Sequence, residues 1–193
     1  MFSLQRLLGK EDMFFELLEA SAQEAHNSVK TLVKLSNALD KPHALAEFSA
    51  ARRGGKQINK KITEAVYTTF VTALEREDIE ALSIALYKIP KTIEKFGERS
   101  LLAPQQVKGV NFSPQIDLLE KATNTVLEMV KSLRRGVNLD EIKQLNDTLQ
   151  QVEGEADSAI MALYKDLYEL LEKVIDRCRD AGNVISHIVL KNS

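Results

Sequence analysis

Two pairs of acidic residues have the spacing and the chemistry of a cation site. Glu153 and Asp157 are four residues apart, and so are Asp176 and Asp180. Residues at this spacing lie on one face of an α-helix, roughly 6 Å apart. Two such pairs on facing antiparallel helices would offer carboxylate oxygens to one ion such as Mg, Mn, Fe or Zn. The alternative is a solvated acidic face, because a chain with 28 acidic residues contains such pairs by chance.

No pattern of residues typical of an enzyme accompanies these carboxylates. The chain contains no Glu-x-x-His motif, no Gly-rich phosphate loop, no Gly-x-Ser-x-Gly and no zinc-spaced cysteines. His26 and His187 lie at helical positions flanked by apolar residues, and Cys178 lies in an apolar-periodic stretch, so we interpret all three as structural. We therefore predict no catalytic residue, and a protein that works by binding rather than by catalysis.

Composition narrows the class of protein further. The 193 residues are 44% hydrophobic and carry a net charge of −2 with no Trp, which disfavours nucleic acid as a partner. The single Cys178 suits a reducing compartment, so we expect a cytoplasmic protein. No run of eighteen apolar residues occurs, so any role at a membrane is expected to be peripheral.

Helical periodicity positions the acidic pairs. Apolar residues recur at helical spacing from Phe14 to Leu35, and a second helix is expected from about Ala44 to Val71. A third begins near Glu75 and carries Pro90 in its interior, where we expect a kink. Residues 100–112 lack periodicity, Ser113-Pro114 gives an N-cap and a first-turn proline, and Asp140 opens a fifth helix. The prediction is an all-α, antiparallel bundle of about six long helices.

The chain also shows signs of an internal repeat. A shift of 101 residues lays 16–19 on 117–120, 29–32 on 130–133 and Tyr67 on Tyr168. It predicts one domain over 1–193, built from a three-helix repeat at about 11–99, a connection at 100–112 and a second repeat at about 113–193. From 147 to 189, however, the only turn signal is Gly154. On one unbroken helix Asp157 and Asp176 would lie roughly 28 Å apart and would share no ion.

A family resemblance covers nearly the whole chain. The stretch 69–79, Thr-Phe-Val-Thr-Ala-Leu-Glu-Arg-Glu-Asp-Ile, resembles the turn of PhoU-like proteins, specifically the phosphate transport regulators associated with Pit-type transporters. The two acidic pairs match that family's (Glu/Asp)-x-x-x-Asp positions. The resemblance implies two repeats of a three-helix bundle and a metal ion held by Glu153, Asp157, Asp176 and Asp180. It also implies a regulatory or accessory role in inorganic phosphate transport, exercised through protein contacts.

The first half departs from the family pattern. The positions at which the family has acidic residues are occupied here by basic or neutral residues. A cation site is therefore expected in the second repeat only. The basic residues there suggest a surface for an anion or for a phosphorylated or acidic partner; the alternatives are a solvated basic face or pairing within the chain. This candidate surface consists of Arg52, Arg53, Lys56, Lys88 and Lys91.

These inferences define the expected partners. A Pit-type phosphate transporter or a signalling protein is expected at the inner face of the membrane, and a homodimer is compatible with the apolar stripes. Two other functions stay open: a metal-binding bundle with a different regulatory role and, least favoured, a metal-dependent phosphoesterase, for which no candidate base stands out.

Overall fold

The computed structural model describes residues 4–39, 41–72, 74–136, 138–158 and 165–192. These residues form six long helices, two short helical turns and no strand, which confirms the all-α class. The bounds of the elements are α1 Leu4–Leu35, η1 Ser36–Ala38, α2 Pro42–Thr68, α3 Arg76–Leu102, α4 Pro104–Val107, α5 Ser113–Arg135, α6 Leu139–Ser158 and α7 Lys165–Asn192.

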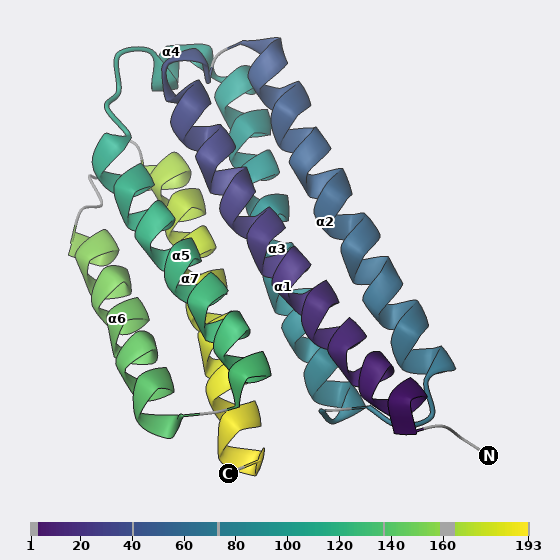
Figure 1. Cartoon of the computed structure of the whole chain (residues 1–193). Coiled ribbons are helices and arrows are strands. Elements are labelled where there is room, and N and C mark those ends of the chain that lie inside the picture. Colours follow the sequence, from purple (N-terminus) through teal and green to yellow (C-terminus); the bar gives the residue numbers. More distant parts are fainter. Residues whose placement is uncertain (1–3, 40, 73, 137, 159–164, 193) are drawn as a thin grey trace.

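The helices pack as two groups of three. α1, α2 and α3 contact one another, and so do α5, α6 and α7. The groups meet where α1 packs against α5 and α3 packs against α7. Figure 1 shows α2 and α6 at opposite edges of the bundle, with the other four long helices between them and both chain ends at the same end of the bundle.

Apolar stripes explain why these helices form and pack. Phe14, Leu18, Val29 and Leu32, part of the stripe predicted on α1, are at most 1% exposed. Burying such a side chain contributes about 2 kcal/mol, which outweighs weak helix propensity. Each long helix contributes residues of this kind to one shared core.

The helix ends follow local capping chemistry, with two corrections to the prediction. Ser113 is the first residue of α5 and Phe112 is its N-cap, so Ser113 is not the N-cap; the backbone N–H of Ser113 donates to Asn111 Oδ1 at 3.0 Å. At α6 the backbone N–H of Asp140 donates to Asn138 Oδ1 at 3.0 Å, so the helix opens before Asp140. Both asparagines precede the residues that sequence reasoning chose.

The glycine pair of α2 has a packing role. Gly55 is buried where α2 crosses α3, and an added Cβ would lie 3.2 Å from Pro90 Cγ and 3.5 Å from Tyr87 Cδ2. α2 runs from Pro42 to Thr68 without a break. Gly55 therefore permits a close approach of α2 and α3.

Aromatic rings join the two halves near one end of the bundle. Phe112 lies 5.5 Å from Phe96 of α3 and 5.6 Å from Tyr168 of α7, measured between ring centroids. Tyr168 is buried near the start of α7, whereas Tyr67 is 76% exposed near the end of α2. The predicted correspondence of Tyr67 with Tyr168 is therefore wrong, because the two occupy different helices of their repeats.

Candidate functional site

The acidic pairs lie on two separate helices. Glu153 and Asp157 belong to α6, and Asp176 and Asp180 belong to α7, which packs along α6. The chain reverses between Ser158 and Lys165, so the unbroken helix considered from the sequence is wrong. Residues 159–164 lie outside the described part. α7 is continuous from Lys165 through Tyr168 to Asn192.

An arginine occupies the space between the two acidic pairs. The Arg179 guanidinium forms an ion pair with Glu153 across the helix interface. The same guanidinium lies 3.7 Å from Asp176 Oδ1 and 3.7 Å from Asp180 Oδ1. Arg177 Nη1 donates to Asp180 Oδ2 at 2.9 Å. Three of the four predicted ligands therefore already have a cationic partner from α7.

The fourth predicted ligand pairs with another carboxyl group. The carboxyl group of Asp157 lies beside that of Glu172, within side-chain interaction distance. Burial, this interaction and the charges of Asp157 and Asp176 raise the pKa of Glu172. Burial and the charge of Asp180 likewise raise the pKa of Asp176. We call these five carboxyl groups, Glu153, Asp157, Glu172, Asp176 and Asp180, the acidic groove.

The carboxyl groups of the acidic groove do not form a preformed cation-binding site. Among the residues that the structure describes, no group of three or more His, Cys, Asp or Glu side chains has a geometry that could hold a metal ion. Arg179 explains why, since it holds Glu153 and lies beside both aspartates. Sequence reasoning missed Arg179 and Glu172 because it searched for acidic pairs at one spacing, although both residues lie within a turn of Asp176.

The basic candidate surface lies on α2 and α3. Arg52 is the exception among its five members, because Arg52 Nη1 lies 2.9 Å from Glu94 Oε2 and its side chain also bonds to Tyr87. The Tyr87 hydrogen bond and the Glu94 charge raise the pKa of Arg52. Arg53, Lys56, Lys88 and Lys91 are exposed. These four side chains carry the positive charge of the surface, and Arg52 helps to fix α2 against α3.

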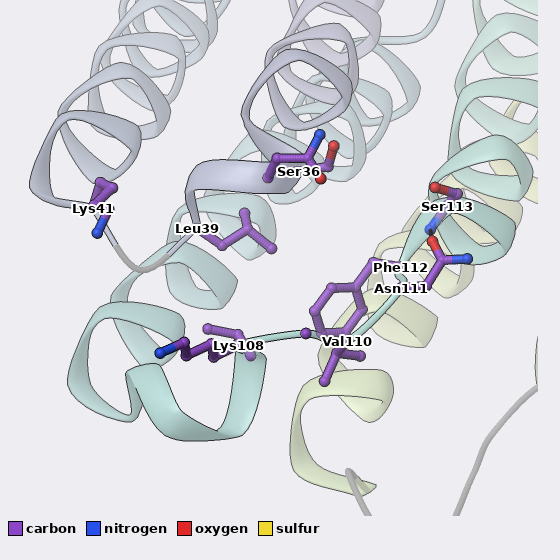
Figure 2. Close-up of a pocket in the computed structure, with 11 residues that line it drawn as sticks. Ser36, Leu39, Lys41, Lys108, Val110, Asn111, Phe112 and Ser113 are labelled. Carbon is purple, nitrogen blue, oxygen red and sulfur yellow. Dashed lines mark hydrogen bonds between the residues drawn. The ribbon is translucent and has the colours of Figure 1, made fainter.

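A cavity of about 550 Å³ opens where η1 meets the segment that leads into α5. Figure 2 shows Lys41 and Lys108 on one side of this cavity and Asn111 and Ser113 on the other. None of the predicted site residues lines it. Sequence reasoning treated 100–112 as a connection only, and its lack of periodicity gave no sign of a cavity.

His26 and Cys178 are held in structural positions, whereas His187 is exposed on α7, so its interpretation as a structural residue is wrong. His26 of α1 is buried, and its Nδ1 lies 3.1 Å from Thr123 Oγ1 of α5. Burial and the charge of Lys30 lower the pKa of His26. Cys178 is fully buried, and burial raises the pKa of its thiol. A neutral thiol away from solvent is a poor nucleophile.

Two relatives match this chain over nearly its whole length. A protein of Rhizobium meliloti named "putative pit accessory protein" is 25% identical, with 97% of each chain covered. The UPF0111 protein YkaA of Bacillus subtilis is 24% identical, covering 95% of this chain and 98% of its own. No family model matches.

Two solved structures superpose on this chain and have the same fold. A PhoU-like protein from Shewanella oneidensis MR-1 superposes with a TM-score of 0.71 at 15% identity, covering 92% of this chain and 99% of its own. A second structure from the same organism, of a "putative PhoU-like phosphate regulatory protein", gives a TM-score of 0.69 at 14% identity with the same coverage. The chain thus has the PhoU-like fold, and the predicted resemblance to PhoU-like Pit accessory proteins is confirmed.

Proposed function

We propose that this chain is an accessory or regulatory protein of inorganic phosphate transport that acts on a Pit-type transporter by direct contact. The observation that carries the proposal is the similarity to a named Pit accessory protein along 97% of both chains. The PhoU-like fold supports it, because two of the matched structures are PhoU-like proteins and the whole bundle is matched. A regulatory role by contact needs surfaces rather than a reaction centre.

The side chains support binding rather than catalysis. Cys178 and His26, which could act as a nucleophile and a base, are both buried and held in the core. Arg53, Lys56, Lys88 and Lys91 are exposed on α2 and α3, whereas the acidic groove on α6 and α7 is half-buried except at Asp157 and is partly neutralised by Arg179. An exposed basic surface is suited to oriented docking on an acidic partner.

The proposed site of action is the cytoplasmic face of the membrane. None of the described helices is both long and apolar enough to cross a bilayer. The basic surface is proposed as a contact for a phosphorylated or acidic segment of the partner. A homodimer is a further proposal, to be tested by sedimentation.

Phosphate uptake in living cells tests the regulatory role. We expect deletion of the gene to change the initial rate of phosphate uptake through the Pit-type transporter, and the full chain to restore it. The quadruple variant Arg53→Glu, Lys56→Glu, Lys88→Glu and Lys91→Glu should restore less. An unchanged uptake rate, with transporter abundance held equal, would contradict the proposed function.

We propose metal binding in the acidic groove as a second candidate activity. The crowding that raises the pKa of Glu172 and Asp176 supports it, since a cation would relieve the same repulsion. Carboxylate oxygens suit Mg, Mn, Fe or Zn, held by Glu153, Asp157, Asp176 and Asp180 once Arg179 has turned aside. Such an ion would bridge α6 and α7. A phosphoesterase that uses it is the least favoured alternative.

Elemental analysis of protein purified without chelator tests this second candidate. A site of this kind predicts bound metal that is lost in a double variant, Asp157→Asn with Asp176→Asn, while Glu47→Gln on α2 leaves it unchanged. Protein that stays free of metal after incubation with Mn, Fe or Zn salts would remove the candidate. Activity on a panel of phosphate esters would be the only support for an esterase.

A further inference from the structure

The turn between α2 and α3 exposes large apolar side chains. Phe70 is 94% exposed, Tyr67 is 76% exposed and Val71 is 43% exposed. All three lie within five consecutive residues, at the end of the bundle that also holds both chain ends. A concentrated apolar patch of this kind, unlike a single exposed side chain, marks a site of interaction. We call these three residues the apolar turn.

Hydrogen bonds hold the apolar turn in shape. The Arg76 guanidinium donates to the carbonyl of Thr69 at 2.8 Å and to the carbonyl of Phe70 at 3.1 Å. Thr72 Oγ1 donates to the carbonyl of Leu74 at 2.7 Å, and the backbone N–H of Thr69 donates to the carbonyl of Ala65. Thr69 itself is buried. The Phe70 ring is therefore presented by a fixed backbone, which lowers the entropic cost of binding.

The charge around the apolar turn indicates the chemistry of its partner. Between Glu64 and Glu80 the chain carries five carboxylates and one basic residue, Arg76, which is engaged in the turn. Lys60 pairs with Glu64, and Lys191 pairs with Glu75 and with the buried Asp78. The exposed acidic residues beside the turn are therefore Glu75 and Glu77. An acidic rim of this kind repels an anionic lipid surface and attracts Lys and Arg side chains.

We propose that the apolar turn docks into an apolar pocket rimmed by Lys and Arg on the cytoplasmic loops of the phosphate transporter. The inference rests on the proposed function and adds the point of contact. Cytoplasmic loops of membrane proteins carry an excess of Lys and Arg, which complements the acidic rim. An exposed aromatic ring at the centre of such a contact supplies much of the binding free energy.

Binding to the Pit-type transporter of the same organism, reconstituted in nanodiscs, tests the proposal. The variants are Phe70→Ala, Arg76→Ala and a control, Leu102→Ala, whose side chain is also exposed but lies at the end of α3 that is remote from the turn. We expect Phe70→Ala to weaken binding about tenfold or more. Arg76→Ala should weaken it less, and Leu102→Ala should leave it unchanged. Raising the ionic strength from about 0.05 M to about 0.5 M should weaken wild-type binding.

The outcomes separate this inference from the proposed function. Equal binding of wild type and Phe70→Ala would overturn the docking role of the turn and leave the proposed function standing. Absence of wild-type binding would overturn both. Phe70-dependent binding to vesicles of anionic lipid without transporter would assign the turn to a lipid surface, and a Phe70-dependent dimer in sedimentation would assign it to a second copy; either result overturns the proposal. Circular dichroism of each variant checks that the helices are intact.

Discussion

Arg179 of α7 forms an ion pair with Glu153 of α6, so a guanidinium of the protein stands among the carboxylates predicted to hold a cation. The neighbours of Arg179 are Asp176 and Asp180 on its own helix, each 3.7 Å away. The acidic groove is thus internally compensated in part, and any external cation has to compete with Arg179.

Replacing Arg179 should destabilise the bundle. In Arg179→Gln, Glu153 loses its partner and the acidic groove loses its central positive charge, so we expect a loss of about 1–2 kcal/mol in the free energy of unfolding. Urea denaturation measures it. Arg177→Gln is the matched control and should cost less, because the ion pair that Arg177 forms within the described part of the chain is with Asp180 on its own helix. Equal effects of the two substitutions would contradict a central role for Arg179.

The same variant should respond to metal. If the acidic groove accepts a divalent ion, the removal of Arg179 leaves its carboxylates free for that ion. Millimolar Mn²⁺ should then raise the melting temperature of Arg179→Gln more than that of the wild type, by linkage. A differential scan with and without EDTA measures the shift. No difference between the two proteins would count against metal binding in the groove.

Glu172 should make the stability of the fold depend on pH, and the sign of that dependence can be predicted. Its pKa is raised above the ordinary 4.5 in the folded state, so folding favours the protonated carboxyl group. That stabilisation is present below pH 4.5 and is lost as the pH rises through the raised pKa. We therefore expect Glu172→Gln to be more stable than wild type at pH 7 and to lose that advantage near pH 4. Glu47→Gln on α2 is the control and should show no such crossover.

His26 should make the stability of the fold depend on pH with the opposite sign. Burial lowers its pKa below the ordinary 6.5, so the unfolded chain binds a proton more readily than the folded protein. The contribution of neutral His26 to the free energy of unfolding is complete above pH 6.5. It declines as the pH falls towards the lowered pKa. In His26→Gln the loss of stability between about pH 7 and pH 5 should be smaller than in wild type. Parallel stability curves for the two proteins in this range would refute the assignment.

A substitution at Gly97 of α3 tests how closely α2 packs on α3. An added Cβ would lie 2.4 Å from Phe48 Cδ2 in the core, so Gly97→Ala should cost about 1–3 kcal/mol of stability by overpacking. Gly154 is the matched control, because an added Cβ on this exposed residue of α6 meets nothing within 4 Å. Gly154→Ala should stabilise the protein by about 0.5–1 kcal/mol through helix propensity. Thermal denaturation of both variants measures the contrast.

The helices could be predicted from the sequence because one face of each is apolar at a period of 3.6 residues. The stripe from Phe14 to Leu32 and the turn before Arg76 follow directly from such patterns. The reversal between Ser158 and Lys165 could not, because residues 159–164 contain no Gly or Pro to mark it. Without such a residue the unbroken helix stayed open as an alternative, whereas the wrong pairing of Tyr67 with Tyr168 came from the 101-residue shift.

The candidate site was predicted less completely than the fold. Spacing placed Glu153 and Asp157 on one helix face, but it gave no register between α6 and α7 and so could not bring Arg179 to Glu153. The pairing of Arg52 with Glu94 was missed for the same reason, since it depends on how α2 crosses α3. Contacts between helices follow from packing, which a periodic pattern does not specify.

Recovery of the transporter from native membranes tests the central claim most directly. The tagged full-length chain, expressed at its natural level, is cross-linked in cells, purified, and its partners are identified by mass spectrometry against a tagged helical protein of similar size and charge. We predict strong enrichment of the Pit-type phosphate transporter over that control. Equal recovery of the transporter with both proteins would contradict an accessory role in phosphate transport.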